Sequence, residues 1–189
     1  MEQSRHDPVA PIGLRVGHGA LLADGGLISV RPLGPEDAHL LEEGLSKMSP
    51  ESRRRRFHTP LKRFSKGMLR HLTQIDGVHH RAWGVFLDDH PVHTGIGVAR
   101  LVEHPDRPDV ADLAITVLDR FQGRGIGRLL LRFLIDEGRA AGYRALSASV
   151  LAENGPMLHL IEQVGGQRTG QARGQIELEI PLGPQRPLA

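Results

Sequence analysis

A strand-like segment that runs through a glycine-rich turn directly into a helix is the feature that most constrains this chain. Residues 113–117 favour a strand, and the apolar residues that follow position 128 recur at helical spacing. Between these segments, glycine occupies the alternate positions 123, 125 and 127. Glycine allows a ligand to approach the backbone closely, and the amides that open a helix have no partner within it. Because the positive end of the helix dipole lies beside them, we expect unpaired amides around residues 123–128 to bind a pyrophosphate.

The spacing of the glycines distinguishes this turn from two common phosphate-binding loops. A P-loop requires Gly-x-x-x-x-Gly-Lys-Ser/Thr, and no lysine follows these glycines. A dinucleotide-binding fingerprint requires Gly-x-Gly-x-x-Gly near the first strand of a βαβ unit, whereas this turn reads Gly-x-Gly-x-Gly late in the chain. A glycine-rich helix entry that binds no ligand remains the alternative.

Length and composition are those of an ordinary soluble protein with one domain. The chain has 189 residues, of which 39% are hydrophobic and 24% are charged. We expect a disordered leader at residues 1–12, a single domain at 13–182 and a disordered tail at 183–189. No apolar run approaches the length of a membrane span, and the absence of cysteine excludes disulfides and thiol nucleophiles. The expected location is cytoplasmic, without a membrane partner, and the expected state is a monomer or a homodimer.

The order of the elements predicts a mixed α/β (α+β) fold. Strands are predicted at residues 18–22, 27–32, 83–87, 94–102, 110–117, 145–150, 167–173 and 175–181. Helices are predicted at residues 35–48, 65–75, 125–141 and 155–164. A further helix is predicted to begin directly after an N-cap at Ser49. Helices placed in this way between strands build a mixed central β-sheet of about seven strands flanked by helices.

The turn Gln122-Gly123-Arg124-Gly125-Ile126-Gly127 resembles the Gln/Arg-x-x-Gly-x-Gly/Ala signature of the GCN5-related N-acetyltransferases, the GNAT family. The segment Asn154-x-x-Met157-x-x-Leu160 resembles a later motif of that family, and residues 31–38 resemble its opening strand and helix. Residues 49–57 and 72–76 look like the acetyltransferase domain of bacterial protein lysine acetyltransferases, so the likeness covers about residues 27–180. It implies the GNAT fold, with a cofactor-binding turn between the fourth main strand and the helix that follows.

The resemblance implies acetyl-CoA as the cosubstrate and assigns residues to each of its parts. The resemblance implies that Ile115 and Val117 bind the thioester and the pantetheine, and that Asn154 and Met157 also contact the pantetheine. The resemblance implies that the pyrophosphate binds at the turn of Gln122, Gly123, Arg124, Gly125, Ile126, Gly127 and Arg128. For Arg124 and Arg128, a solvated position at the helix entry is the alternative.

Acetyl transfer to an alkyl ammonium requires a base, because a lysine side chain has a pKa of about 10.4. The resemblance to the lysine acetyltransferase branch places that base, a glutamate in the family, at Asp112, which is one methylene shorter. Glu103 and Asp109 flank the same hairpin as substitutes, and Asp112 could also be a solvated carboxylate at a strand edge. Many family members protonate the leaving thiolate with a tyrosine, where this chain has Ile161. A thiol with a pKa of about 8.5 can leave without a dedicated acid.

Two other patterns suggest functions that the residues do not support. The run Arg53-Arg54-Arg55-Arg56 lacks interleaved aromatic residues and points in four directions on a helix, so we expect a solvated helix and no nucleic-acid partner. His79, His80, His90 and His93 fit no usual zinc spacing and no cysteine accompanies them, so no metal is expected.

These residues together predict an acetyl-CoA-dependent N-acetyltransferase, with a protein lysine as the first choice of acceptor. A small amine such as a polyamine, an amino acid or an antibiotic is the second choice. The third is a non-catalytic acyl-CoA-binding regulatory domain, which is favoured by Asp112 in place of glutamate and by Ile161 in place of tyrosine.

Overall fold

The computed structural model describes residues 14–17, 19–22, 24–89 and 92–183. The predicted leader at 1–12 and all but Gly183 of the predicted tail lie outside the described residues. Residues 90 and 91, which lie between the strands predicted at 83–87 and 94–102, are outside them as well.

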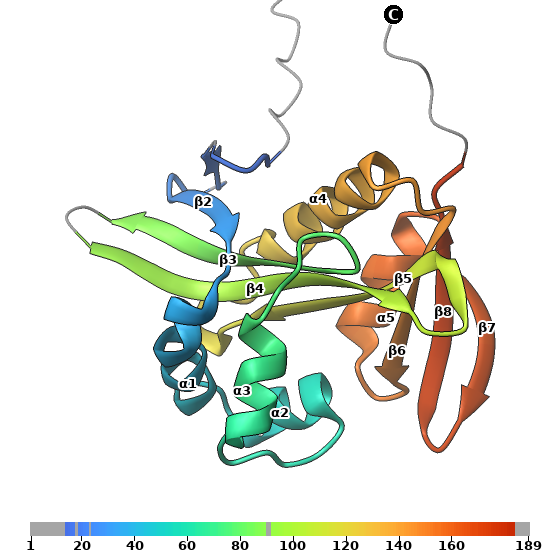
Figure 1. Ribbon diagram of the computed structural model, residues 1–189, viewed down its shortest axis with the longest axis horizontal. Helices are drawn as coiled ribbons and strands as arrows, with labels where there is room; N and C mark the ends of the chain where they lie inside the picture. The colour runs from blue at the N-terminus through green and yellow to red at the C-terminus, as the bar shows by residue number, and fades with distance from the viewer. Residues whose placement is uncertain (1–13, 18, 23, 90–91, 184–189) are drawn as a thin grey trace, which may run out of the picture.

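Eight strands form a single sheet in the order β1-β2-β3-β4-β5-β6-β8-β7 (Figure 1). All neighbouring strands are antiparallel except β5 and β6, which run parallel. The strands are β1 Ala20–Leu21, β2 Leu27–Pro32, β3 His80–Asp89, β4 Val92–His104, β5 Arg107–Val117, β6 Ala145–Leu151, β7 Gln167–Ala172 and β8 Gln175–Pro181. The predicted mixed sheet of about seven strands is thus observed with eight, of which the edge strand β1 covers Ala20–Leu21 of the segment predicted at 18–22.

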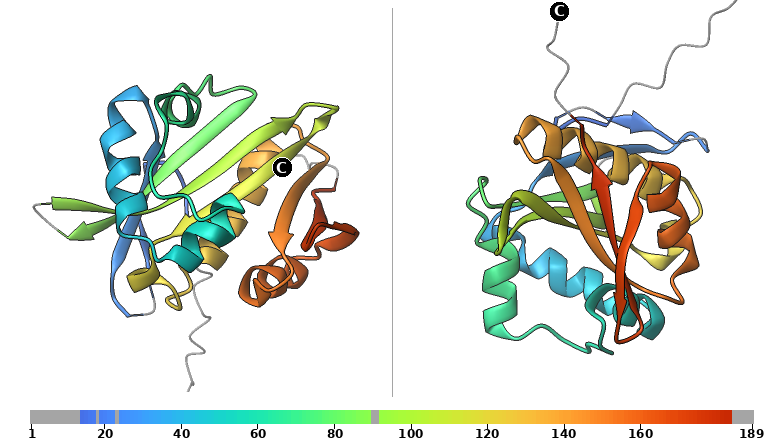
Figure 2. Two further views of the ribbon diagram at one scale, coloured as in Figure 1. Left: turned by 90° about the horizontal axis from the view of Figure 1, so that it is seen from below. Right: turned by 90° about the vertical axis from the view of Figure 1, so that its right-hand side faces the viewer.

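The helices cover both faces of this sheet, with α1, α2 and α3 on one face and α4 on the other (Figures 1 and 2). They are η1 Pro35–Asp37, α1 Ala38–Ser46, α2 Pro50–Phe57, α3 Lys66–Thr73, η2 Asp119–Phe121, α4 Ile126–Ala140 and α5 Gly155–Gln163, where η denotes a 3₁₀ helix. The Ser49 hydroxyl accepts a hydrogen bond from the Ser52 amide at 3.1 Å, so the predicted N-cap of α2 is confirmed. The helix predicted at residues 35–48 is instead divided into η1 and α1.

An ion pair between the half-exposed Arg31 and the buried Asp37 fixes the segment that joins β2 to α1. The Arg31 guanidinium donates two hydrogen bonds to the Asp37 carboxylate, at 2.9 and 2.7 Å. The Gly34 amide adds a third at 2.9 Å, and Asp37 is only 2% exposed. Arg31 thereby holds the pKa of Asp37 below its usual range. Because loss of Arg31 would leave the buried Asp37 carboxylate without its charge partner, the pair helps to hold α1 in place over the sheet.

The apolar stripe of α4 anchors the glycine-rich turn to the sheet. Leu130, Leu131 and Leu134 are completely buried, and each contributes roughly 1.5–3 kcal/mol of transfer free energy. Phe133 packs edge-on against Trp83 of β3, with ring centroids 5.1 Å apart. This packing fixes the first turn of α4 beside the end of β5.

Strands β5 and β6 separate soon after they meet. Only Val110–Asp112 pairs with Ala145–Ser147. Beyond these positions β5 continues to Val117 along β4, and β6 continues to Leu151 along β8. In the described part of the chain no further pairing joins the two strands, so their facing backbone edges are left open to a ligand.

Candidate functional site

The turn between β5 and α4 presents a row of free backbone amides. Gly123 and Gly125 have φ angles of 76° and 81°, and apart from its chain neighbours no described atom lies within 4 Å of the place where a Cβ atom would stand on either. In the described backbone, the amides of residues 123–127 donate no hydrogen bond. The amides of Gln122 and Arg128 donate to Asp119 and Gly125, each at 3.1 Å. The predicted row is therefore one residue too long, because the amide of Arg128 closes the first turn of the helix.

A groove of about 1170 Å³ runs from this turn along the gap between β5 and β6. It brings together most of the residues predicted to hold a cofactor, namely Ile115, Val117, Gln122, Gly123, Ile126, Gly127, Asn154 and Met157. Arg124, Gly125 and Arg128 do not line it. Arg124 is bound to Asp24 at 2.5 Å, and Arg128 donates to Gln163 at 2.8 Å. Both arginines thus have protein partners and lie outside the lining of the groove.

A polar network ties α2 to the turn. The Ser49 and Ser52 hydroxyls each donate to the Asp119 carboxylate at 2.7 Å. The Gln122 side chain donates to the Val117 carbonyl at 2.9 Å and to the Ser52 hydroxyl at 3.4 Å. Burial alone would raise the pKa of Asp119, but the serine hydrogen bonds outweigh burial and lower it. Sequence reasoning missed Asp119, although the Ser49 cap is a signal that it did detect.

The structure brings one of the predicted catalytic carboxylates to the groove. Asp112 lines it and accepts a hydrogen bond from the Ser147 hydroxyl. Glu103 does not line it, whereas its strand neighbours Val102 and His104 do, so its side chain lies on the opposite face of β4. There Glu103 contacts His79 at 2.9 Å and raises the pKa of that histidine.

The groove is lined by a second carboxylate, which the sequence did not reveal. Glu177 of β8 accepts a hydrogen bond from the Ser149 hydroxyl at 2.7 Å. It belongs to an alternating run of polar and apolar residues that is typical of a half-exposed strand, so no local pattern marks it out. Asp109, the other substitute base, is instead paired with Arg144 and does not line the groove.

No tyrosine lines the groove in the described part of the chain. Ile161 is fully buried in the core. The hydroxyl of Tyr143 lies 3.4 Å from the Val78 carbonyl, and burial raises its pKa. Neither Ile161 nor Tyr143 therefore supplies a proton donor in place of the family tyrosine.

The run of arginines on α2 is only partly solvated. Arg54 and Arg55 form ion pairs with Glu153 and Glu51. Arg56 instead turns inward, where its Nε donates to the Thr116 hydroxyl at 3.1 Å. The prediction of a wholly solvated helix is therefore wrong for Arg56, because α2 docks against β5.

Two of the four histidines that could suggest zinc have other partners. His79 contacts Glu103, and His80 contacts Arg100. His90 and the side chain of His93 lie outside the described residues. Among the described residues, no three histidine or acidic side chains gather closely enough to hold a metal ion. None of the described helices has both the length and the apolar character needed to span a bilayer.

Known proteins match this chain over the same region. The model of the acetyltransferase (GNAT) family matches residues 48–166. The chain belongs to the GNAT acetyltransferase family. It is 30% identical over 163 residues to acetyltransferase PA5475 of Pseudomonas aeruginosa, covering 85% of this chain and 87% of that protein. It is 28% identical over 155 residues to acetyltransferase Pat of Mycolicibacterium smegmatis, covering 82% of this chain and 46% of that protein.

A solved structure supports the same assignment. The GNAT domain of S. lividans PAT superposes with a TM-score of 0.80 at 27% identity, covering 87% of this chain and 96% of that domain. The predicted fold, the family and the acyltransferase class are thereby confirmed. The GNAT chain described here spans about half the length of the Mycolicibacterium relative.

Proposed function

We propose that this GNAT chain transfers an acetyl group from acetyl-CoA to a primary amine. The observation that carries the proposal is the position of the free amides of residues 123–127 at the end of the gap between β5 and β6. These amides and the α4 dipole suit a pyrophosphate, and the open edge of β5 at Ile115 and Val117 suits a pantetheine arm. Acetyl-CoA supplies the acetyl thioester when it is bound.

The acceptor that we propose first is a protein lysine. The support is the likeness of residues 49–57 and 72–76 to bacterial protein lysine acetyltransferase domains. The groove has room for a lysine side chain, and its carboxylates Asp112 and Glu177 attract an ammonium group.

Asp112 is the residue that we propose to take the proton from the ammonium. It lies where β5 and β6 separate, and Ser147 orients its carboxylate. A base must be within hydrogen-bond reach of the proton, either directly or through one water molecule. The shorter side chain of aspartate favours the route through water. With Ile161 buried, the thiolate leaves without a dedicated acid.

The test combines two measurements on the full chain. Calorimetric titration with acetyl-CoA reports the cofactor site, and thiol release in the presence of folded proteins and small amines reports transfer. We expect binding, and we expect turnover with at least one protein whose lysines become acetylated. Binding without turnover across the whole panel would favour the non-catalytic alternative, and turnover with small amines alone would replace the lysine acceptor. Failure to bind acetyl-CoA would contradict the proposed cofactor site.

A further inference from the structure

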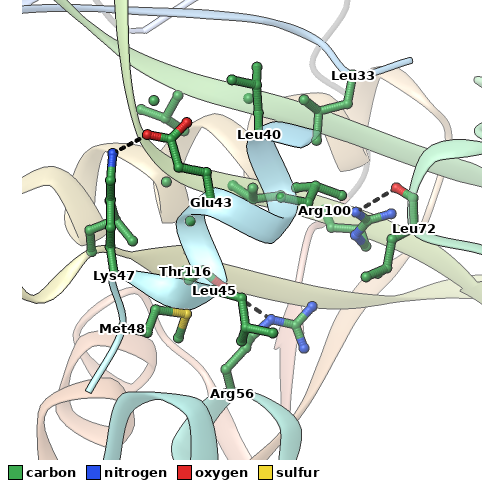
Figure 3. A pocket seen from close by; sticks show the side chains of 18 of the residues that line it. Leu33, Leu40, Glu43, Leu45, Lys47, Met48, Arg56, Leu72, Arg100 and Thr116 are labelled. Carbon is green, nitrogen blue, oxygen red and sulfur yellow. Dashed lines mark hydrogen bonds and ion pairs between the residues drawn. The ribbon is translucent and has the colours of Figure 1, made fainter. Parts of the chain in front are cut away.

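A second, smaller cavity lies between α1 and the sheet, next to the groove (Figure 3). Its volume is about 290 Å³, and its walls are mostly apolar. Among the apolar side chains that line it are Leu41, Leu45, Met48, Phe64, Leu72 and Phe86. Two arginines, Arg56 from α2 and Arg100 from β4, line both this cavity and the groove.

Arg100 is almost completely buried and incompletely bonded. It is 4% exposed. One terminal nitrogen contacts His80 Nε2, and the other donates to the Leu72 carbonyl at 2.9 Å. Its Nε atom is buried and has no hydrogen-bond partner among the residues that the structure describes. Neither protein partner of Arg100 is a carboxylate, so its charge is solvated by dipoles alone.

Neither arginine has a counter-charge among the described residues. Arg56 donates only to the Thr116 hydroxyl, although its helix neighbours Arg54 and Arg55 both form ion pairs. The acidic groups near the cavity and groove are otherwise engaged. Glu43 is paired with Lys47 at 2.5 Å, as Figure 3 shows, and Asp112 and Glu177 accept hydrogen bonds from serines.

Each of the two guanidinium groups raises the electrostatic free energy of burying the other's positive charge. Burial, followed by the charge of Arg56, lowers the pKa of Arg100 to about 10, so this side chain still carries its charge at neutral pH. His80 offers no compensation, because it accepts a hydrogen bond from Arg100 and has no negative charge. A buried charge without a partner is destabilising, and an anion between the two arginines would offset that cost.

We propose that this cavity binds a small carboxylate with an apolar body, whose carboxylate group pairs with Arg100 and Arg56. The flat guanidinium group matches a carboxylate through two parallel hydrogen bonds. The apolar walls favour a hydrocarbon body over a phosphate, which would need further donors. The volume of about 290 Å³ suits a body of the size of a leucine or phenylalanine side chain.

The position of the cavity connects this ligand to the acceptor side of the groove. Thr116 of β5 lines both spaces, next to the strand positions that we propose for the thioester. This connection rests on the proposed function, whereas the binding of the carboxylate does not. An acceptor that carries such a carboxylate beside its amine would place that amine near the edge of β5.

The test is calorimetric titration of the full chain with 4-methylpentanoate, with 4-methylpentanamide as the uncharged analogue of the same shape. We expect the acid to bind and the amide to bind at least about tenfold more weakly. Equal binding of the two, or no binding of the acid, would overturn the proposal. Inorganic phosphate that competes with the acid for the same site would overturn it too. Titration with acetyl-CoA in the same samples reports the proposed function separately.

Variants locate the site. Arg56→Gln should weaken the acid at least about tenfold, whereas Arg54→Gln, on the same helix but ion-paired to Glu153, should leave binding unchanged. Arg100→Lys keeps a charge but loses the fork, and should also weaken binding. Because Arg100 is buried, its variant is compared by thermal unfolding before titration. If Arg56→Gln and Arg54→Gln bind the acid equally, the carboxylate does not bind at this pair.

Discussion

Asp112 and Ser147 face each other at the last paired position before β5 and β6 separate, and the serine hydroxyl donates to the aspartate carboxylate. The pair therefore lies at the closed end of the groove, where a carboxylate can reach an amine that approaches the edge of β5. Glu177 lies on β8 within the same groove, so the two carboxylates can be compared directly by substitution.

The first prediction concerns Asp112→Asn. The amide keeps the shape of the side chain and a hydrogen bond with Ser147 but cannot take a proton, so kcat/KM should fall about 10²-fold or more. Affinity for acetyl-CoA should be unchanged, which calorimetry checks beside thiol release. Asp106→Asn, on the exposed turn between β4 and β5, is the control and should be as active as the wild type. A large loss in Glu177→Gln together with an active Asp112→Asn would move the base to β8.

The second prediction compares the two ends of α4. Gly125 and Gly142 both have left-handed φ angles, 81° and 86°, with open space where a Cβ atom would stand. Replacement of either by valine should cost about 1–2 kcal/mol of stability, because an L-residue is strained in this region. Only Gly125→Val should abolish acetyl-CoA binding, since a strained valine at this position would displace the free amides of residues 123–127 that we place on the pyrophosphate.

Chemical denaturation and calorimetry on the two glycine variants give both readouts. A matched loss of stability with a selective loss of binding supports the site. If Gly125→Val binds acetyl-CoA like Gly142→Val, the amides of this turn do not hold the cofactor.

The parts of this site that could be predicted from sequence are the parts set by local chemistry. A left-handed glycine such as Gly125 and a serine cap such as Ser49 act on their own turn of the chain, so their signals survive without a structure. The direction of Arg56 depends on how α2 docks against β5, which no local pattern records. For Glu103, a signal was present: it shares its strand face with Leu101, a core residue, which places it away from the groove.

The third prediction concerns the network that joins α2 to the cofactor turn. Asp119→Ala removes the acceptor of the Ser49 and Ser52 hydroxyls, so the free energy of unfolding should fall by about 1–3 kcal/mol. Because Ser52 also contacts Gln122, affinity for acetyl-CoA should fall as well. The lowered pKa of Asp119 gives stability that is present above its ordinary value of 3.8 and is lost as pH falls below it. Urea unfolding at pH 7 and at pH 3 should therefore show a smaller penalty for the variant at the lower pH.

The fourth prediction concerns His80, whose pKa burial, Arg100 and His71 together lower from 6.5 to about 4. Between these values the unfolded chain binds a proton that the folded chain does not. The contribution of His80 to the free energy of unfolding is therefore fully present above pH 6.5 and decreases as pH falls toward 4. The contribution is on the order of 3 kcal/mol, and other groups add their own dependence. Substitution of His80 by glutamine should remove this part of the slope in urea unfolding between pH 7 and pH 4, whereas His159→Gln, at an exposed position on α5, should keep it. An unchanged slope in the His80 variant would mean that the imidazole titrates normally, and that Arg100 does not hold it neutral.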